Sequence, residues 1–195
     1  MRQRKQGPGG PHVKFGFMRY LLGLLGSAVL LLASGDLSGR RAPGFSLPDL
    51  HLKQHDLQDY RGKVVIIDIM QTTCPHCQQL AGVLEKVSAK YGEKVAVLTI
   101  ALPPDNQSTV ARFTAEYKVT APILFDCGQV SASYLKATPQ NPKANVPHVF
   151  LIDGHGTIRN DFGYEFDTRN MFEGDGLEVE VDRLLGSPAP AKSKK

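Results

Sequence analysis

The spacing of apolar residues changes period once in the middle of the chain, and the change marks a strand followed by a helix. Residues 64–67 form a continuous apolar run, which is typical of a strand buried on both faces of a sheet. After residue 77 the apolar residues recur at helical spacing and form one stripe: Leu80, Val83, Leu84, Val87 and Tyr91. The segment between the two elements, residues 68–77, therefore lies where a buried strand passes into an amphipathic helix.

Later segments repeat this alternation. The pattern predicts a second buried strand over 94–102, a helix over about 106–117, a short strand over 122–126 and a closing helix over about 175–185. Residues 153–156 read as a turn between two final strands, 149–152 and 157–162, which would pair as an antiparallel hairpin. Strands that alternate with helices indicate an α/β protein with a parallel sheet and right-handed crossovers.

The first 41 residues read as a leader. They hold seven Lys/Arg and one Asp, and the basic residues precede an apolar run at 20–33. A positive flank followed by a short apolar run is typical of a secretory signal or signal-anchor. We therefore expect an exported protein, periplasmic or on the outer side of the cytoplasmic membrane, that stays membrane-bound if the leader is not cleaved. Residues 35–43 read as a linker, 42–186 as one domain and 187–195 as a disordered tail.

The net charge of +4 comes from the two ends of the chain. Between residues 42 and 187 there are 13 basic and 18 acidic residues, so the predicted domain is acidic. A basic face for nucleic acid is not expected. Three cysteines are too few for a disulfide scaffold, so the fold must rest on its hydrophobic core.

Two of the cysteines form the motif Cys74-Pro75-His76-Cys77 at the predicted start of the helix after residue 74. Unpaired backbone N–H groups and the helix dipole favour a thiolate there, and Pro75 fits the first helical turn. A structural disulfide is one alternative, and half of a zinc site is another. Structural zinc takes four ligands, and no second Cys-x-x-Cys is present to complete such a site. A redox-active dithiol is the interpretation that we favour.

At this point the chain resembles the thioredoxin superfamily, and within it the membrane-anchored TlpA-like or ResA-like thiol–disulfide oxidoreductases. The resemblance rests on four segments: 42–50, 59–65, the dithiol and 146–153. It implies an α/β protein with a thioredoxin-like fold over roughly residues 42–185, in which a central mixed sheet has helices on both faces. The sequence departs from the family at Thr73, where a tryptophan is usual, and at Gly82, where a helix-kinking proline is usual.

The resemblance also implies roles for individual residues. Cys74 would attack or be attacked, and Cys77 would resolve the mixed disulfide. Asp68 matches the buried aspartate that takes the proton of the resolving thiol. Pro147 would be cis beside the dithiol, and we expect Val146, Pro147 and Pro75 to contact a substrate that is added as a strand.

His76 is expected to set the redox poise. Positive charge beside the thiolate stabilises the reduced form and makes the disulfide a stronger oxidant. The same Pro-His dipeptide occurs in DsbA, which also has a valine before its cis-proline, whereas the rest of the chain resembles reductases. The direction of electron flow stays open.

Three alternatives concern other chemistry. A copper chaperone could bind Cu(I) through Cys74, Cys77 and a histidine such as His148, although such proteins of this fold space their cysteines one residue wider. A peroxidase is disfavoured because Gln71 stands where peroxiredoxins carry a catalytic threonine. Cys127 could be a third redox or metal-binding sulfur, but a small buried packing residue is the interpretation that we favour.

The expected partners follow from the dithiol. They are protein thiols or disulfides together with a membrane redox partner, and no nucleic acid. No cofactor is expected beyond the redox-active Cys74–Cys77 disulfide itself.

Overall fold

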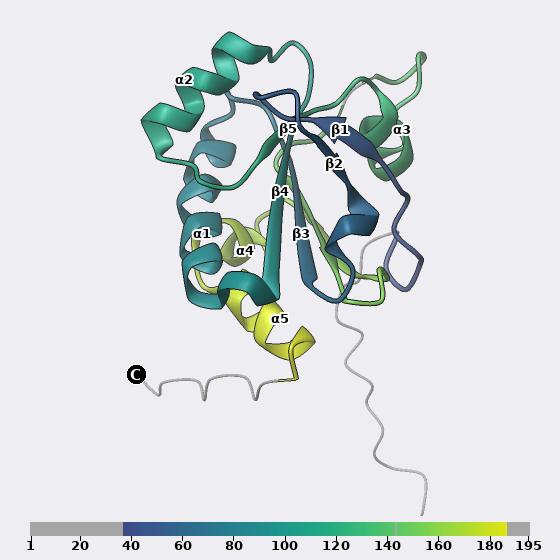
Figure 1. Ribbon diagram of the computed structural model, residues 1–195, viewed down its shortest axis with the longest axis vertical. Coiled ribbons are helices and arrows are strands. Elements are labelled where there is room, and N and C mark those ends of the chain that lie inside the picture. The colour runs from purple at the N-terminus through teal and green to yellow at the C-terminus, as the bar shows by residue number, and fades with distance from the viewer. Residues whose placement is uncertain (1–36, 143, 187–195) are drawn as a thin grey trace, which may run out of the picture. The chain divides into compact units, whose positions relative to one another are not determined.

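The computed structural model describes residues 37–142 and 144–186 (Figure 1). The predicted leader up to residue 36 and the predicted disordered tail therefore lie outside the described residues. Within those two ranges, no helix combines the length and the apolar character that crossing a membrane requires.

A five-stranded mixed sheet forms the centre of the domain. Its strands are β3 (Val64–Met70), β4 (Val95–Ala101), β5 (Ile123–Phe125), β6 (His148–Ile152) and β7 (Ile158–Gly163), in the order β5-β4-β3-β6-β7. β3, β4 and β5 are parallel, whereas β6 and β7 run antiparallel to their neighbours. All seven residues of β3 are buried, because β3 is the middle strand and both of its faces are covered.

Helices α1 (Pro75–Tyr91) and α5 (Gly176–Leu184) cover one face of the sheet. The predicted stripe of α1 is the buried one, because Leu80, Leu84 and Val87 pack against Val64 and Ile66 of β3. The short helix α4 (Arg169–Glu173) contributes Phe172 to the same cluster. α2 (Gln107–Tyr117) packs through Phe113 against Met70 and Cys77, on the same side of the sheet.

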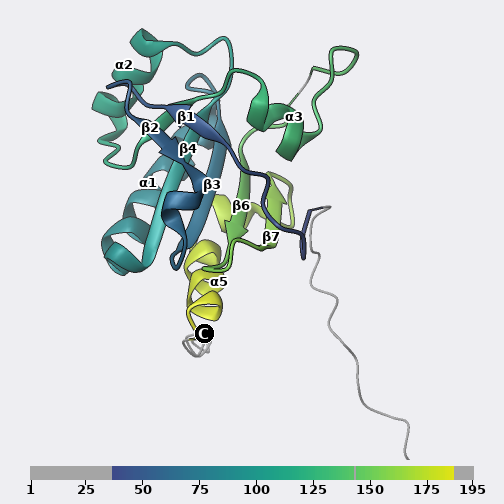
Figure 2. The ribbon, with the colours of Figure 1, turned by 45° about the vertical axis from the view of Figure 1, so that its right-hand side comes forward.

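The opposite face of the sheet is covered by shorter elements. β1 (Ser46–Pro48) and β2 (Gln54–Asp56) form a small hairpin, which the 3₁₀ turn η1 (Leu57–Tyr60) follows. Elsewhere in the chain, a second 3₁₀ turn, η2 (Gly92–Lys94), joins α1 to β4. Leu47, Leu57 and Tyr134 pack on this face, the last from α3 (Gln129–Leu135). Figures 1 and 2 show α3 and the hairpin on the side of the sheet away from α1. Helices thus lie on both faces, as predicted for this α/β fold.

Three features differ from the sequence prediction. Residues 37–41 are packed on the domain rather than forming a linker: Leu37 is buried in the core, and Gly39 and Arg40 exchange backbone hydrogen bonds with Ile158. The helices α3 and α4 were not predicted. They are seven and five residues long, too short for a helical period to appear in the sequence.

Candidate active site

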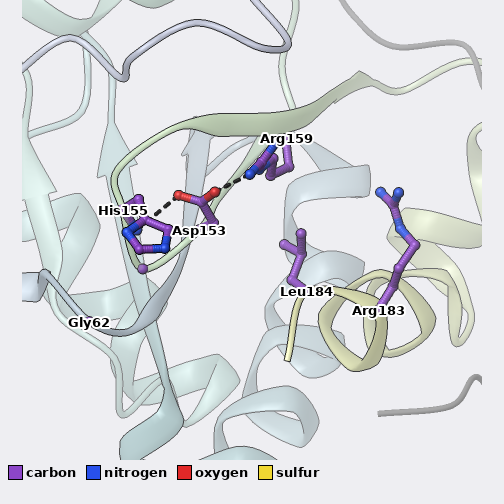
Figure 3. A pocket seen from close by; sticks show the side chains of 7 residues that line it. Gly62, Asp153, His155, Arg159, Arg183 and Leu184 are labelled. Atoms are coloured by element: carbon purple, nitrogen blue, oxygen red, sulfur yellow. Dashed lines mark hydrogen bonds and ion pairs between the residues drawn. The ribbon is translucent and has the colours of Figure 1, made fainter. Parts of the chain in front are cut away.

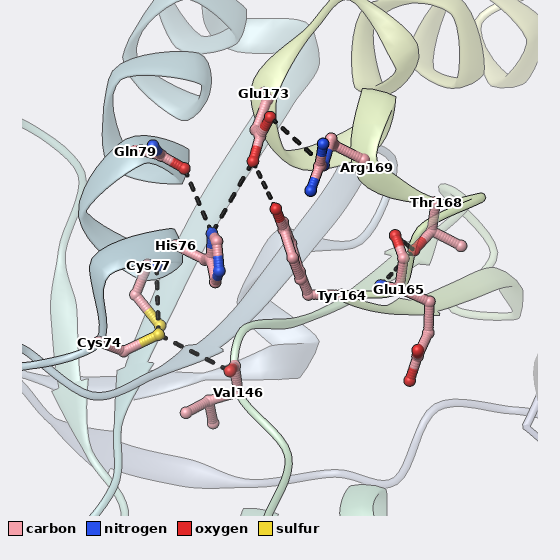
Figure 4. Close-up of polar contacts among 10 residues, drawn as sticks. All are labelled: Cys74, His76, Cys77, Gln79, Val146, Tyr164, Glu165, Thr168, Arg169 and Glu173. Atoms are coloured by element: carbon pink, nitrogen blue, oxygen red, sulfur yellow. Dashed lines mark hydrogen bonds and ion pairs between the residues drawn. The ribbon is translucent and has the colours of Figure 1, made fainter.

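The dithiol lies where β3 passes into α1, at the carboxyl end of the parallel strands. Cys74 is the N-cap residue of α1, and its sulfur accepts a hydrogen bond from the Cys77 backbone N–H at 3.4 Å. Pro75 occupies the first turn and is exposed. Cys74 is half-buried, whereas Cys77 is 1% exposed, and both are free thiols (Figure 4). Only the first sulfur is therefore within reach of a large partner.

Polar contacts fix the loop that precedes the dithiol. The Asp105 carboxylate accepts hydrogen bonds from the backbone N–H and the hydroxyl of Thr72, the former at 2.7 Å. Gln78, in the first turn of α1, donates to the Thr72 carbonyl at 2.9 Å. These contacts tie the loop before Cys74 both to α1 and to the segment after β4.

The loop before β6 lies against Cys74. The Val146–Pro147 peptide bond is cis, as the resemblance implied, and Pro147 is buried. The Cys74 thiol donates to the Val146 carbonyl, with sulfur and oxygen 3.7 Å apart. The structure therefore brings Cys74, Cys77 and Val146 together, although Val146 is 72 residues from Cys74 along the chain.

Asp68 lies inside the sheet below the dithiol. It is 2% exposed and pairs in register with Thr99 of β4 and Val149 of β6. Burial raises the pKa of the Asp68 carboxyl to about 7, and a hydrogen bond with the Thr99 side chain opposes part of that change. This carboxyl can therefore gain and lose a proton near neutral pH.

The Cys77 thiol and the Asp68 carboxyl influence each other. Burial raises the pKa of the Cys77 thiol well above its ordinary value, and the negative charge of Asp68 raises it further. Cys77 therefore stays protonated unless a nearby base takes its proton. The negative charge of the buried Asp68 carboxylate acts on this thiol.

His76 lies in the first turn of α1, in a cluster that the sequence did not predict. Its ring stacks on Tyr164, with ring centroids 3.8 Å apart, and its Nδ1 lies 3.3 Å from Gln79 Oε1 and 3.8 Å from Glu173 Oε1. The Tyr164 hydroxyl donates to the same Glu173 carboxylate (Figure 4). In the described part of the chain these contacts hold the imidazole toward α4.

The remaining candidate residues lie outside this arrangement. Cys127 is exposed, so the prediction of a buried packing residue is wrong. Its neighbour Asp126 is buried instead, and the Asp126 carboxylate accepts hydrogen bonds from the Val130 and Ser131 N–H groups of α3. His148 lies 3.4 Å from the Asp161 carboxylate and stacks on Phe150. Among the described residues, no three His, Cys, Asp or Glu side chains gather as a metal site would require. The copper alternative finds no support in this geometry.

A large surface pocket lies at the other end of β3. It has a volume of about 740 Å³ and is lined by Gly62, just before β3, by the Asp153–His155 turn and by Arg159, Arg183 and Leu184 (Figure 3). Arg159 donates to Asp153, and Arg183 donates to Glu180. Its arginines are thus neutralised within the chain, and the pocket is separated from the dithiol by the length of the strand.

Sequence reasoning missed Tyr164, Glu173 and Thr99 as neighbours of the site. Tyr164 and Glu173 reach His76 from a loop and a short helix that carry no periodic signal. Thr99 could have been found, because parallel pairing of the two predicted strands places it opposite Asp68.

Comparisons with known proteins agree with this geometry. The model of the AhpC/TSA family matches residues 38–161. The chain is 30% identical over 128 residues to the thioredoxin-like protein YneN of Bacillus subtilis. The aligned residues cover 65% of this chain and 71% of that protein. It is 31% identical over 137 residues to the thiol-disulfide oxidoreductase ResA of Bacillus thuringiensis, covering 70% of this chain and 75% of ResA.

Solved structures show the same fold. A putative thioredoxin from Neisseria meningitidis superimposes with a TM-score of 0.60 at 25% identity, covering 78% of this chain and 93% of that one. A putative thiol:disulfide interchange protein DsbE from Chlorobium tepidum superimposes with a TM-score of 0.62 at 24% identity, covering 76% of this chain and 98% of that one. The dithiol at the start of α1, the family match and these relatives together show that the chain belongs to the AhpC/TSA family of thioredoxin-like proteins, among the TlpA/ResA-like thiol–disulfide oxidoreductases.

Proposed function

We propose that the chain is an exported oxidoreductase that exchanges disulfides with protein substrates through Cys74 and Cys77. The observation that carries the proposal is the placement of the two sulfurs. Cys74 caps α1 and faces the Val146 carbonyl, while Cys77 is buried one helical turn below it. A half-exposed attacking thiol with a sheltered resolving thiol is the arrangement that disulfide exchange requires.

The exchange proceeds in two steps. The Cys74 thiolate attacks a substrate disulfide, so that a mixed disulfide forms and one substrate thiolate leaves. The Cys77 thiol then gives its proton to the Asp68 carboxylate, and its sulfur attacks Cys74, which releases the second substrate thiolate and leaves a Cys74–Cys77 disulfide. The same steps in reverse oxidise a substrate dithiol. No further cofactor takes part.

The substrate would be held by backbone contacts at Val146 and Pro147, with Pro75 at the rim. Val146 lies next to Cys74, and the loop leads directly into β6, so an extended peptide can approach the sulfur alongside it. Thr73 is exposed where relatives usually carry tryptophan, so this surface is less apolar than the resemblance implies. Specificity would then rest more on backbone pairing than on an aromatic contact.

Export is proposed from the sequence of the leader. The basic flank and the apolar run at 20–33 support a location of the domain on the extracytoplasmic side of a membrane, where a membrane redox partner would restore the dithiol or the disulfide.

Substitution of each cysteine tests the exchange. Cys74→Ser should abolish turnover of a protein disulfide, because the attacking sulfur is lost. Cys77→Ser should instead accumulate mixed disulfides with the substrate, because nothing resolves them. Non-reducing gels and insulin reduction measure both effects, and Cys127→Ser serves as the control because Cys127 is an exposed thiol outside the motif. A Cys74→Ser protein with undiminished turnover would disprove the proposal.

A further inference from the structure

One oxygen of the buried Asp68 carboxyl has no partner in the described part of the chain. Asp68 is 2% exposed, a hydrogen bond joins its carboxyl to the Thr99 side chain, and its Oδ1 accepts none. An unpaired buried carboxylate oxygen is destabilising unless water or another polar group reaches it.

Asp68 borders a small internal cavity. The cavity has a volume of about 10 Å³ for the centre of a water molecule, which is room for one. Its polar lining consists of Asp68, Thr99 and Glu85, and the rest is apolar. A water molecule there would have the two to four polar partners that buried water requires.

Glu85 stands between this cavity and solvent. It lies on α1 two turns beyond Cys77 and is half-buried. Its two carboxylate oxygens accept hydrogen bonds from the backbone N–H and the hydroxyl of the exposed Thr120, at 2.8 and 2.7 Å. A carboxylate has about four acceptor positions, so Glu85 keeps capacity for a water molecule on the cavity side. Thr120 also lines an outer pocket of about 380 Å³, which shares Val119 and Ala121 with the cavity.

We propose that Glu85 relays protons between Asp68 and solvent through a water molecule in this cavity. The inference rests on the proposed function, since it supplies the exit for the proton that Cys77 gives up. When Cys77 attacks the mixed disulfide, its proton passes to the Asp68 carboxylate. Asp68 then protonates the cavity water, which passes a proton to Glu85, and Glu85 releases it to solvent. Asp68 is left ionised for the next turnover.

The surroundings make Glu85 the group through which this proton leaves. Of the residues that line the cavity, only Asp68 from β3 and Glu85 from α1 can titrate. β4 contributes Val97 and Thr99, α2 contributes Phe113, and the segment before β5 contributes Val119 and Ala121. The charge of Asp68 also acts on the Cys77 thiol.

The two steps of the exchange can be timed separately to test the relay. The full chain carrying Cys127→Ser, purified in mild detergent, is mixed in a stopped-flow instrument with dithiobis(nitrobenzoate). Attack by Cys74 releases one coloured thiolate, and attack by Cys77 on the mixed disulfide releases the second. Glu85→Gln should leave the first release unchanged and slow the second by about tenfold, between about pH 6 and about pH 8. The amide can still contact Thr120, so only the titratable proton is lost.

The controls separate a relay from a structural role. Glu116→Gln removes the same charge from the exposed side of α2 and should leave both releases unchanged. Glu85→Asp keeps a carboxyl and should restore at least half of the lost rate. In an Asp68→Asn background, Glu85→Gln should cause no further slowing, because Glu85 acts through Asp68.

Two outcomes would overturn the relay. One is a Glu85→Gln protein whose second release matches that of Glu116→Gln, and the other is equal slowing by Glu85→Gln with and without Asp68. Failure of the proposed function would look different. If Cys77 is not the resolving thiol, the second release would proceed at the unsubstituted rate in Cys77→Ser as well.

Discussion

Asp68 is the residue through which the site and the stability of the fold are linked. A carboxyl whose pKa is about 7 in the folded protein, against an ordinary value of 3.8, is held neutral by burial up to about pH 7. Below about pH 4 the folded and unfolded states are both protonated. Between about pH 4 and about pH 7 the unfolded state loses this proton and the folded state keeps it, so stability falls as pH rises.

Replacement of Asp68 by Asn should remove this fall in stability with rising pH. The difference in unfolding free energy between Asp68→Asn and the unsubstituted protein should grow in favour of the variant from about pH 4 to about pH 7. Its full size is about 4 kcal/mol, from about 1.4 kcal/mol for each pH unit between the two pKa values.

Urea unfolding at several pH values measures this difference. Asp167→Asn, at an exposed position, is the matched control and should show little pH-dependent change. A difference for Asp68→Asn that is flat with pH would contradict the linkage.

His76 is a second residue with a testable effect, and the quantity that we expect it to change is the reduction potential of the dithiol. Its Nδ1 lies 3.8 Å from the Glu173 carboxylate, and a positive charge near Cys74 would stabilise the thiolate of the reduced protein. His76→Pro should therefore lower the reduction potential by about 30 mV, equivalent to about 1.4 kcal/mol for a two-electron couple.

Equilibration with glutathione measures the potential of each variant. The fraction of Cys74 thiolate, followed by its ultraviolet absorbance, should fall together with the potential. His51→Ala, in the turn between β1 and β2, is the control and should change neither quantity. A potential that stays constant while the thiolate fraction falls would show that His76 does not set the poise.

At the scale of elements, the long periodic segments could be predicted and the short ones could not. The strand-to-helix transition at Cys74, the helix after residue 106 and the final hairpin follow from apolar spacing and capping residues. α3 begins after Gly128 with its N–H groups held by Asp126, and this tertiary arrangement leaves no period in the sequence. Likewise, His76 meets Tyr164 and Glu173 only because α4 packs on α1, and nothing near His76 in the sequence indicates that contact.

The segment before β1 is the element whose packing matters most for a truncated protein. Leu37 is 8% exposed in the core, and its backbone N–H donates to the Asp161 carboxylate at 3.2 Å. Leu37→Ala should lower the free energy of unfolding by about 2–3 kcal/mol, because a buried leucine side chain is lost.

Leu52→Ala makes the same chemical change at a side chain that is 71% exposed, and should shift the unfolding free energy by less than about 0.5 kcal/mol. Equal effects at the two positions in denaturant titrations would mean that residues 37–41 do not contribute to the core. A fragment that begins at Ala42 should be less stable than one that begins at Leu37 for the same reason.

At the scale of the whole molecule, the basic net charge of the chain conceals an acidic domain. The net charge is +4, yet the 13 basic and 18 acidic residues between 42 and 187 leave this part acidic. Long-range electrostatics of the domain would therefore favour substrates with basic segments near the cysteine, and would weaken as salt is added.

The end of α5 gives the molecule a convenient point of attachment. Arg183 and Leu184 line the same pocket as Gly62, which precedes β3, whereas Cys74 follows the other end of that strand. A fluorescent protein, an affinity handle or a solid support joined at Gly186 would therefore sit a full strand length from the reactive sulfur. Immobilised on a surface through that position, the protein would present Cys74 to the solution, ready to capture proteins that pair with it.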